Sequence, residues 1–328
     1  MPDDLDYQIV HALQVAPRAP WGVIGDVAGV SAATASRRWE RLVDSGLAWI
    51  VTYPGAAYLN TRCSAFVEVQ TAAGRGEVVA RLAHDRHVAT IQRIAGDGDL
   101  LLTVMIESLD HLGDWVQELA DWDGVARTRT RVVTRVLGES ERWRVHALTE
   151  DEEAVIAEHR PVSRPLAHEP DEIDLKLIAE LAADGRRSAV DLAAATGLSA
   201  PTVRRRLTNL VGEHVLSIRC EVAHVISGWP VTANVWARAT SRSIAALSTA
   251  LGELPQVRVC CEVTGTANII MGVWLRTVGE LAEFEQELEG LVPGLVVVDR
   301  SVTLATPKRL GSLLDRSGCR TGAVPVVL

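Results

Sequence analysis

The chain has 328 residues, 48% of them hydrophobic, and a formal net charge of −9 at pH 7. This length exceeds the usual size of one domain, so several separate cores are expected. No apolar run approaches the roughly 20 residues that a membrane helix needs, and the start Met1-Pro2-Asp3-Asp4 lacks the basic and apolar regions of a signal peptide. We therefore expect a soluble, cytoplasmic protein that does not bind a membrane.

The cysteines show neither a metal-binding nor a disulfide pattern. No CxxC or Cys/His spacing joins them, and their odd number argues against a disulfide framework. Cys260 and Cys261 are adjacent, so on a strand they would point to opposite faces and could not share a metal ion. We expect reduced, structural cysteines, and we predict neither a metal site nor a cofactor.

The chain contains an internal repeat at an offset of 168 residues. Residues 5–50 align with residues 173–218 without a gap, with 12 identities in 46 positions. The similarity continues with small gaps, and Gly96 matches Gly265. Two copies of one module, each with a helical part and a longer second part, explain this better than chance.

The helical part of copy one has a Gly-containing turn that begins at Gly29 and leads into a further helix. On that helix Ala35, Trp39 and Leu42 share one side and should face the core. The opposite side carries Ser36, Arg37, Glu40 and Arg41.

Copy one departs from a simple three-helix pattern in its first loop. Pro17 and Pro20 stiffen this loop and Trp21 makes it bulky. If the outward sides of these helices contact a nucleic acid, that of copy one is therefore expected to bind it more weakly than that of copy two, or to serve assembly. On the outward side, Glu40 can accept a hydrogen bond from cytosine or pair with Arg37 one turn earlier.

After each helical part the pattern changes from helical spacing to strand-like alternation. The order is β-α-β-β-α-β, a ferredoxin-like arrangement that gives an antiparallel sheet covered by two helices. The expected elements are 65–70, 77–83, 88–94, 100–106, 110–119 and 125–137 in copy one, and 233–239, 243–251, 257–263, 269–275, 278–288 and 296–304 in copy two.

A glycine-rich connection joins the two central strands of each second part. Its residues are Gly96, Asp97, Gly98 and Asp99 in copy one, and Gly265, Thr266, Ala267 and Asn268 in copy two. Glycines that adopt positive φ are typical of tight hairpins, so a plain turn explains the pattern. Exposed amides beside a carboxylate can also hold a small zwitterion such as an amino acid, and we keep both interpretations.

Arginines alternate along the last strand of copy one, at Arg127, Arg129 and Arg131. Alternation places all three on one face of the sheet. The default interpretation is a solvated face, and the alternative is contact with an acidic partner surface.

The segment between the copies contains a short helix and a linker. The helix is expected over residues 149–159, with Thr149 and Glu152 at capping-box spacing, and residues 160–170 follow with three prolines. The segment from about Lys308 onward, rich in Gly and Ser, reads as a loosely held tail.

The helical part of copy two shows the helix-turn-helix pattern most clearly. A first helix runs to about residue 183, a second spans residues 188–196 and stops at Gly197, and Ser199 then offers an N-cap for the third. Val203, Leu207 and Leu210 lie on its inner side. The outer side carries Arg204, Arg205, Thr208 and Asn209.

This outer side has the chemistry of a recognition helix in the major groove. Arginine contacts phosphates or binds guanine bidentately, and Asn and Thr can read base edges. A solvated helix face is the alternative, but three successive arginines behind a capped turn favour DNA. The predicted DNA-binding residues are Ser31, Thr34, Ser36, Arg37, Arg38, Glu40 and Arg41 in copy one, and Ser199, Thr202, Arg204, Arg205, Arg206, Thr208 and Asn209 in copy two.

The negative net charge does not contradict this prediction. Residues 139–172 hold 10 acidic and 4 basic residues, which accounts for most of the excess. Residues 5–50 hold 4 of each sign, and residues 173–218 hold 5 acidic and 6 basic residues. The arginines on one face therefore matter more than the charge of the whole chain.

At this point the sequence resembles the Lrp/AsnC, or feast-famine, family of transcription regulators, in a tandem form. The resemblance rests on the start Leu5-Asp6 with its twin Ile173-Asp174, on the GVS and GLS turns at Gly29 and Gly197, and on the GxxD loop. It runs twice, from residue 5 to about 137 and from 173 to about 310. The resemblance implies an α+β fold, with a winged or tri-helical helix-turn-helix and a βαββαβ domain, the pair repeated twice.

The resemblance also implies partners. In that family the GxxD loop lies at a subunit interface where amino-acid effectors bind, which favours an effector role for both loops. Copy two has Asn268 where the family usually has Asp, so its site is expected to be altered or lost. The family assembles through its sheets, so we expect either a homo-oligomer or pairing of the chain's own two sensing domains.

The expected domains are therefore two pairs joined by a linker. They are residues 1–55 and 171–222 for DNA binding, 60–138 and 228–310 for ligand sensing and assembly, 139–170 for the helix and linker, and 311–328 for the tail.

The sequence predicts a DNA-binding regulator modulated by a small molecule, and it predicts no enzyme. No GxSxG or HExxH motif and no phosphate-binding glycine loop is present. One alternative is a tetrapyrrole (sirohaem) decarboxylase, the activity of some tandem AsnC-like proteins. Such an enzyme would need histidines near the sheet, whereas residues 258–264 hold Cys260 and Cys261 without His or Tyr. Another alternative is a ligand-binding module that does not contact DNA.

Overall fold

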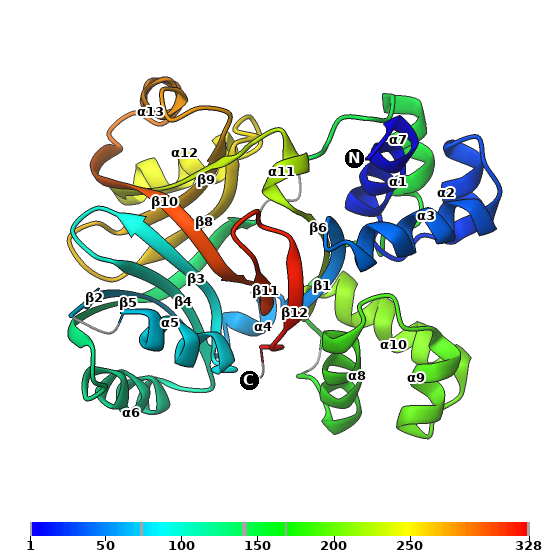
Figure 1. The fold of residues 1–328 in the computed structure, drawn as a ribbon, viewed down its shortest axis with the longest axis horizontal. Coiled ribbons are helices and arrows are strands. Elements are labelled where there is room, and N and C mark those ends of the chain that lie inside the picture. The colour runs from blue at the N-terminus through cyan, green and yellow to red at the C-terminus, as the bar shows by residue number, and fades with distance from the viewer. Residues whose placement is uncertain (1, 73–74, 140–142, 168, 327–328) are drawn as a thin grey trace. The chain divides into compact units, whose positions relative to one another are not determined.

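The computed structural model describes residues 2–72, 75–139, 143–167 and 169–326. They form two compact units, each built from both copies of the repeat. The helix-turn-helix unit comprises residues 1–61, 144–226 and 310–327, and the sheet unit comprises residues 62–143 and 227–309. Figure 1 shows the helices of copy one in blue and those of copy two in green within the helix-turn-helix unit.

Each copy contributes three helices to the helix-turn-helix unit, as predicted. Copy one has α1 (Asp4–Val15), α2 (Trp21–Val27) and α3 (Ala32–Asp44), and copy two has α8 (Glu172–Ala183), α9 (Ala189–Thr196) and α10 (Ala200–Gly212). Asp3 and Asp171 form capping boxes at the first helices, because each carboxylate accepts a backbone N–H three residues later. Gly197 ends α9 in the left-handed conformation, with φ of 74°.

The inner faces of the third helices are the predicted ones. Val203, Leu207 and Leu210 of α10 are buried, and so are their counterparts Ala35, Trp39 and Leu42 of α3. Burying these side chains anchors each third helix against the other two, which leaves its opposite face outside the core.

A two-stranded ribbon joins the two copies within this unit. Strand β1 (Ala48–Pro54) pairs antiparallel with β6 (Leu216–Val222), and Val51 lies opposite Arg219, the residue at the equivalent position 168 residues later. Pairing about equivalent positions is what a two-fold interface between identical chains would have. Two one-turn helices follow the strands, α4 (Ala56–Leu59) and α11 (His224–Ser227).

Between the copies, helix α7 (Glu150–Ala157) has the predicted capping box of Thr149 and Glu152. The segment before α7 is held to α1, because the backbone N–H groups of Ala147 and Leu148 donate to His11 Nδ1 at 3.1 and 2.9 Å. Residues 160–167 and 169–170, within the predicted linker, contain no helix or strand.

The predicted loose tail is an ordered hairpin, so that expectation was wrong. Strands β11 (Ser312–Leu314) and β12 (Arg320–Ala323) pair antiparallel. The Arg320 N–H donates to the Gly46 carbonyl at 2.9 Å. A Cβ at Gly46 would lie 2.3 Å from the Arg320 carbonyl oxygen, so only glycine fits this approach.

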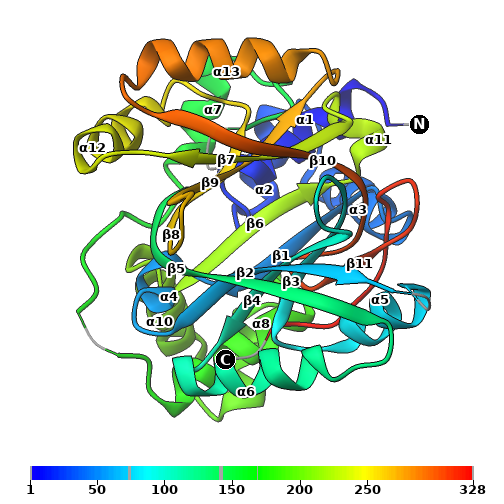
Figure 2. The same cartoon turned by 90° about the vertical axis from the view of Figure 1, so that its left-hand side faces the viewer.

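The sheet unit contains the two predicted βαββαβ domains. Copy one supplies β2 (Cys63–Thr71), α5 (Arg75–His84), β3 (Val88–Ala95), β4 (Leu100–Ile106), α6 (Leu109–Ala120) and β5 (Val125–Glu139). Copy two supplies β7 (Val231–Arg238), α12 (Ser241–Ala250), β8 (Val257–Val263), β9 (Ile269–Leu275), α13 (Glu280–Leu291) and β10 (Val296–Arg309). Figure 2 shows α12 and α13 beside the strands of copy two.

The two domains share one sheet that closes on itself. Within this sheet the strands of the two domains follow the order β10-β3-β4-β2-β5-β8-β9-β7, and β7 also pairs with β10. The long strands β5 and β10 make this closure: each pairs along its first half with its own copy and along its second half with the other copy. Edges that would otherwise be open to another chain are thus paired within this one.

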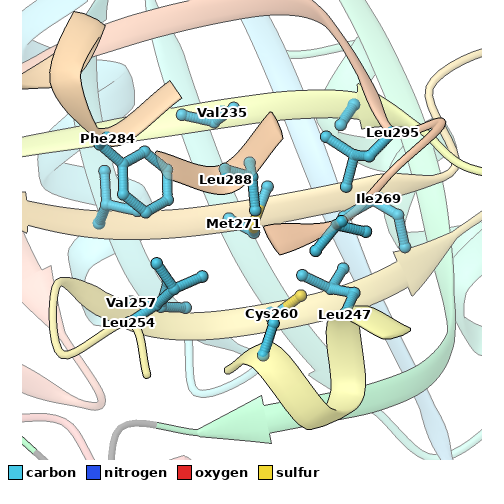
Figure 3. Close-up of a cluster of buried hydrophobic side chains, with 14 of the residues drawn as sticks. Val235, Leu247, Leu254, Val257, Cys260, Ile269, Met271, Phe284, Leu288 and Leu295 are labelled. Atoms are coloured by element: carbon cyan, nitrogen blue, oxygen red, sulfur yellow. The ribbon is translucent and has the colours of Figure 1, made fainter. Parts of the chain in front are cut away.

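Each domain has its own apolar core between strands and helices. In copy two, Phe284 and Leu288 of α13 pack against Met271, Ile269 and neighbouring strand residues, as Figure 3 shows. A third apolar cluster fills the other face of the sheet, with residues of both copies including Phe66 and Trp236.

The cysteines lie where the sequence predicted. Cys260 belongs to the core of copy two, whereas its neighbour Cys261 belongs to the cluster on the other face. All the cysteines are free, and burial raises the pKa of the Cys260 thiol. Within the described residues, no group of His, Cys, Asp and Glu side chains is placed to hold a metal ion. Nor does any helix of that part of the chain combine the length and apolar character needed to cross a bilayer.

Candidate nucleic-acid interface and effector site

The outward face of α10 presents two adjacent arginines. Arg204 and Arg205 are exposed, and Thr208, also exposed, donates its hydroxyl to the Arg204 carbonyl at 3.0 Å. Asn209 is partly exposed on the same side. Both guanidinium groups extend from a helix whose opposite side is fixed in the core, so they are available to a polyanion.

The outward face of α3 has a different composition. Arg37 is exposed, as is Glu40, which accepts a hydrogen bond from the Ser36 hydroxyl at 3.2 Å. Arg41 is 64% exposed and lies 3.8 Å from an Asp6 carboxylate oxygen. Negative groups therefore neighbour the arginines of this face.

Two equivalent arginines in the predicted DNA-binding set form hydrogen-bonded ion pairs within the chain. Arg38 donates to Asp3 and Asp6 at 2.6 and 3.0 Å, and Arg206 pairs in the same way with the equivalent carboxylates of α8, Asp171 and Asp174. These carboxylates raise the pKa of both guanidinium groups. Each pair ties the third helix of a copy to the capping box of its first helix, which is a structural role that the sequence did not predict.

The hydroxyl residues at the start of each third helix act on the backbone. Ser31 accepts from the Thr34 N–H at 3.1 Å, and Ser199 accepts from the Thr202 N–H at 3.3 Å. In each pair the two hydroxyl oxygens are also 2.9 Å apart. Ser31 and Ser199 are therefore the N-caps of these helices, and the expected DNA contact of all four residues remains a prediction.

A reciprocal pair of arginines holds the two helix-turn-helix copies together. Arg18 donates to the carbonyls of Gly185 and Arg187 at 2.6 and 2.9 Å. Arg186, its equivalent, donates to the carbonyls of Pro17 and Ala19 at 2.6 and 2.9 Å. Burial, and to a smaller extent the nearby Arg18, lower the pKa of Arg186 to about 10. The two copies therefore meet in a nearly symmetric contact.

The bulky first loop of copy one belongs to this contact. The Arg186 guanidinium lies 4.1 Å from the centre of the Trp21 ring, in a cation–π arrangement. Trp21 therefore takes part in assembly of the two copies. The sequence signal for this contact was available, since Arg18 and Arg186 are identical in loops whose other residues differ.

In the sheet unit, the polar residue that ends each glycine loop is bonded to a neighbouring strand end. Asp99 accepts from the Thr71 N–H and hydroxyl at 2.8 and 3.0 Å. Asn268 accepts from the Ala239 N–H at 2.8 Å and donates to the Ala239 carbonyl at 2.9 Å. Both side chains hold their hairpins in place, so Asn268 keeps the structural function of Asp99.

Each hairpin also lies against the last strand of the other copy. A Cβ at Gly96 would lie 3.2 Å from the Ser301 Cβ on β10, and a Cβ at Gly265 would lie 3.6 Å from the Arg131 Nε on β5. Gly96 and Asp97 are exposed. The predicted effector loops thus lie where the two copies meet. Effector contact stays a prediction for Gly96, Asp97, Gly98, Asp99, Gly265, Thr266, Ala267 and Asn268.

The alternating arginines of β5 differ in exposure, because Arg127 and Arg129 are exposed as expected whereas Arg131 is partly buried. Arg127, Arg129 and Arg131 lie opposite residues of β2 that share their face, as predicted. Arg131 is 16% exposed, forms an ion pair with Glu68, and lies 4.1 Å from the centre of the Trp236 ring. The acidic partner of this arginine is therefore in the chain itself.

Lys308 is a buried residue that the sequence placed in the tail. It is fully buried on β10, and its Nζ donates to the Asp85 carbonyl of copy one at 2.7 Å. Burial lowers its pKa to about 8. The residue fixes the end of β10 to copy one and thereby helps to close the sheet.

A helix-turn-helix family model matches both copies of the repeat, and a ligand-binding family model matches copy one. The AsnC-type helix-turn-helix domain matches residues 3–43 and 171–211, and the Lrp/AsnC ligand binding domain matches residues 64–143. The chain belongs to the Lrp/AsnC family. It is a tandem member, because its second βαββαβ domain repeats the arrangement of the matched one.

Curated relatives correspond to one copy each. The HTH-type transcriptional regulator FL11 of Pyrococcus furiosus is 26% identical over 138 residues, which are 41% of this chain and 90% of FL11. The Bkd operon transcriptional regulator of Pseudomonas aeruginosa is 29% identical over 140 residues, which are 42% of this chain and 92% of that protein.

A solved structure shares the tandem arrangement over nearly the whole chain. The siroheme decarboxylase NirDL, in complex with an iron-uroporphyrin III analogue, matches 94% of this chain and 93% of its own, with a TM-score of 0.58 and 15% identity. This finding overturns the expectation that the chain is not an enzyme, because the same double architecture is that of an enzyme. At this identity, the likeness establishes the fold alone.

Proposed function

We propose that this chain is a sequence-specific DNA-binding transcription regulator whose activity responds to a small molecule. The observation that carries the proposal is the outward face of α10. Arg204 and Arg205 are exposed side by side on an N-capped helix that is anchored by buried Val203, Leu207 and Leu210. Exposed arginines beside Thr and Asn are suited to phosphate contact and base-edge readout.

The joining of the two copies supports the same function. Dimeric helix-turn-helix proteins present two recognition helices to two half-sites, and the symmetry of the protein sets the symmetry of the site. Here the contacts of Arg18 and Arg186, together with the β1–β6 ribbon, join two such helices in one chain. One chain can thus supply what two subunits supply elsewhere.

Footprinting on the promoter regions of its own gene and of adjacent genes tests DNA binding. We expect a protected site, with an affinity that falls steeply as salt increases because arginines displace counterions from the phosphates. A scrambled duplex of equal length is the control. Binding that is absent, or equal on both duplexes at all salt concentrations, would contradict the proposal.

The small-molecule part of the proposal concerns the glycine loops. Each loop lies against the last strand of the other copy, and Gly96 and Asp97 of the first loop are exposed. A ligand that prefers the folded chain must raise its melting temperature, so a thermal-shift screen of the amino acids tests this role. Asp97→Ala is the matched variant, since Asp97 is exposed whereas Asp99 holds the hairpin. No shift with any amino acid would contradict an amino-acid effector.

Action on an iron tetrapyrrole is the second candidate function. The observation in its favour is the likeness to siroheme decarboxylase NirDL along the full tandem arrangement. Titration with sirohaem, followed by its visible absorption and by mass analysis of the product, tests this candidate. A spectral change with loss of carboxyl groups would support it, and an unchanged spectrum and mass would reject it.

A further inference from the structure

The two third helices share one scaffold but present different outward chemistry. Equivalent outward positions hold Ser36 and Arg204, Arg37 and Arg205, Glu40 and Thr208, and Arg41 and Asn209. Only the second of these pairs is identical. Both helices have an apolar inner face and a serine N-cap, so the difference in charge and polarity lies on the surfaces that would meet a ligand.

The electrostatic surroundings of the two helices also differ. On α3, Glu40 is exposed and Arg41 lies close to Asp6, whereas no acidic residue occupies an outward position of α10. Helix α7 adds further carboxylates to copy one, because its first turn is Glu150, Asp151, Glu152 and Glu153. This helix is attached to copy one through His11. The local charge therefore favours a polyanion at α10 over α3.

The contact between the copies is nevertheless nearly symmetric. Arg18 and Arg186 donate to equivalent pairs of carbonyls, with distances of 2.6 and 2.9 Å in both directions. The β1–β6 ribbon is centred on the equivalent residues Val51 and Arg219. A nearly two-fold scaffold thus holds two third helices, α3 and α10, whose outward faces differ. Two identical subunits would present identical outward faces.

We propose that a single chain reads an operator with two unlike half-sites, and that the half-site of α10 dominates affinity. This inference rests on the proposed DNA-binding function. Arg204, Arg205 and Asn209 suit a half-site with guanine and adenine in the strand that they contact. Glu40, between Arg37 and Arg41, suits a half-site in which a cytosine lies between guanines.

Selection from a random double-stranded library with the full-length chain tests the inference. We expect enrichment of a non-palindromic site, with one chain bound per duplex in native mass spectrometry. A palindromic site, or a single half-site with no preference beyond it, would overturn the inference and leave DNA binding intact. Enrichment of no sequence at all would instead reject the proposed function.

Exchange of the outward residues adds a second measurement. The triple variant Ser36→Arg, Glu40→Thr and Arg41→Asn gives α3 the outward face of α10, and should shift the selected site toward a palindrome. The reciprocal variant Arg204→Ser, Thr208→Glu and Asn209→Arg is the matched control, and should weaken binding at least tenfold. These positions lie outside the buried cores, so circular dichroism melts should match those of the unaltered chain. A folded α3 variant that selects the unaltered site would overturn the inference.

Discussion

The third helices of the two copies, α3 and α10, are held in the fold in the same way but differ in the residues that they present outward. Each has an apolar buried face, a serine N-cap and ion pairs from Arg38 or Arg206 to the capping box of its first helix. Their outward faces share only Arg37 and Arg205. The contacts that hold the fold are repeated in kind, whereas the outward residues differ in charge and polarity, which is expected if each outward face has its own task.

The largest expected effect tests the shared scaffold. Arg186→Ala removes two charge-assisted hydrogen bonds and leaves the Pro17 and Ala19 carbonyls without these donors, so the free energy of unfolding should fall by on the order of 3 kcal/mol. Arg18→Ala should cost somewhat less, because its hydrogen bonds are equivalent but Arg186 also contacts the Trp21 ring. Denaturant unfolding measures both.

Arg187→Ala is the control for this pair. Its side chain forms a partly exposed ion pair with Glu180, which should be worth about 1 kcal/mol or less. An Arg186→Ala variant no less stable than Arg187→Ala would show that the symmetric contact does not hold the copies together.

The next effect concerns the contact of His11, on α1 of copy one, with the backbone segment before α7. His11 is buried, and burial lowers its pKa to about 4 from 6.5. The unfolded chain therefore takes up the proton first. The stability that neutral His11 supplies is complete above pH 6.5 and is lost as the pH falls toward 4.

Protonation of Nδ1 would also break the bonds from Ala147 and Leu148. We expect a loss on the order of 2 kcal/mol between pH 7 and pH 4.5, measured as unfolding free energy. His11→Gln removes the titration and should flatten the curve in this range. Parallel curves for the variant and the unaltered chain would contradict the role of His11.

The loss of DNA affinity on removing one arginine from each outward face compares α10 with α3 directly. Arg205→Ala should lower affinity about tenfold and reduce the salt slope by about 1, as expected for a lost phosphate contact. Arg37→Ala should lower affinity only about threefold, because Glu40 already weakens the local positive potential. Fluorescence anisotropy on the selected site measures both, and equal losses would argue against dominance of α10.

The last comparison concerns the glycine hairpins. Asp99→Ala and Asn268→Ala each remove two hydrogen bonds to a neighbouring strand end, so each should cost about 1–2 kcal/mol of unfolding free energy. Asp99→Asn keeps an acceptor for Thr71 and should cost less. If Asn268→Ala has no effect while Asp99→Ala does, the two hairpins are not structurally equivalent.

The sequence predicted the elements well because local pattern decides them. The β4 prediction, residues 100–106, coincides with the observed strand, and Ser199 caps α10 as expected. The predicted end of the last strand at residue 304 was too early, since β10 continues to Arg309. Its final residues include Lys308, a charged residue that reads as exposed until its buried carbonyl partner is known.

The candidate sites were predictable only in part. The exposed Arg204 and Arg205 follow from helical spacing, but the spacing could not show that Arg206 is bound by Asp171 and Asp174. Nor could it show that the Asp99 carboxylate is already occupied by Thr71. These partners lie up to 35 residues away in sequence, beyond the range of any periodic pattern.

By itself the sequence determined that this protein has two copies of one module, the order of helices and strands in each, and which side of every third helix is apolar. These features depend on residues a few positions apart, whose spacing fixes local conformation and burial. Only the tertiary structure decided that Arg18 and Arg186 exchange hydrogen bonds and that β5 and β10 close one sheet. Such contacts join groups more than 100 residues apart, and which of many possible partners they choose depends on how the whole chain packs.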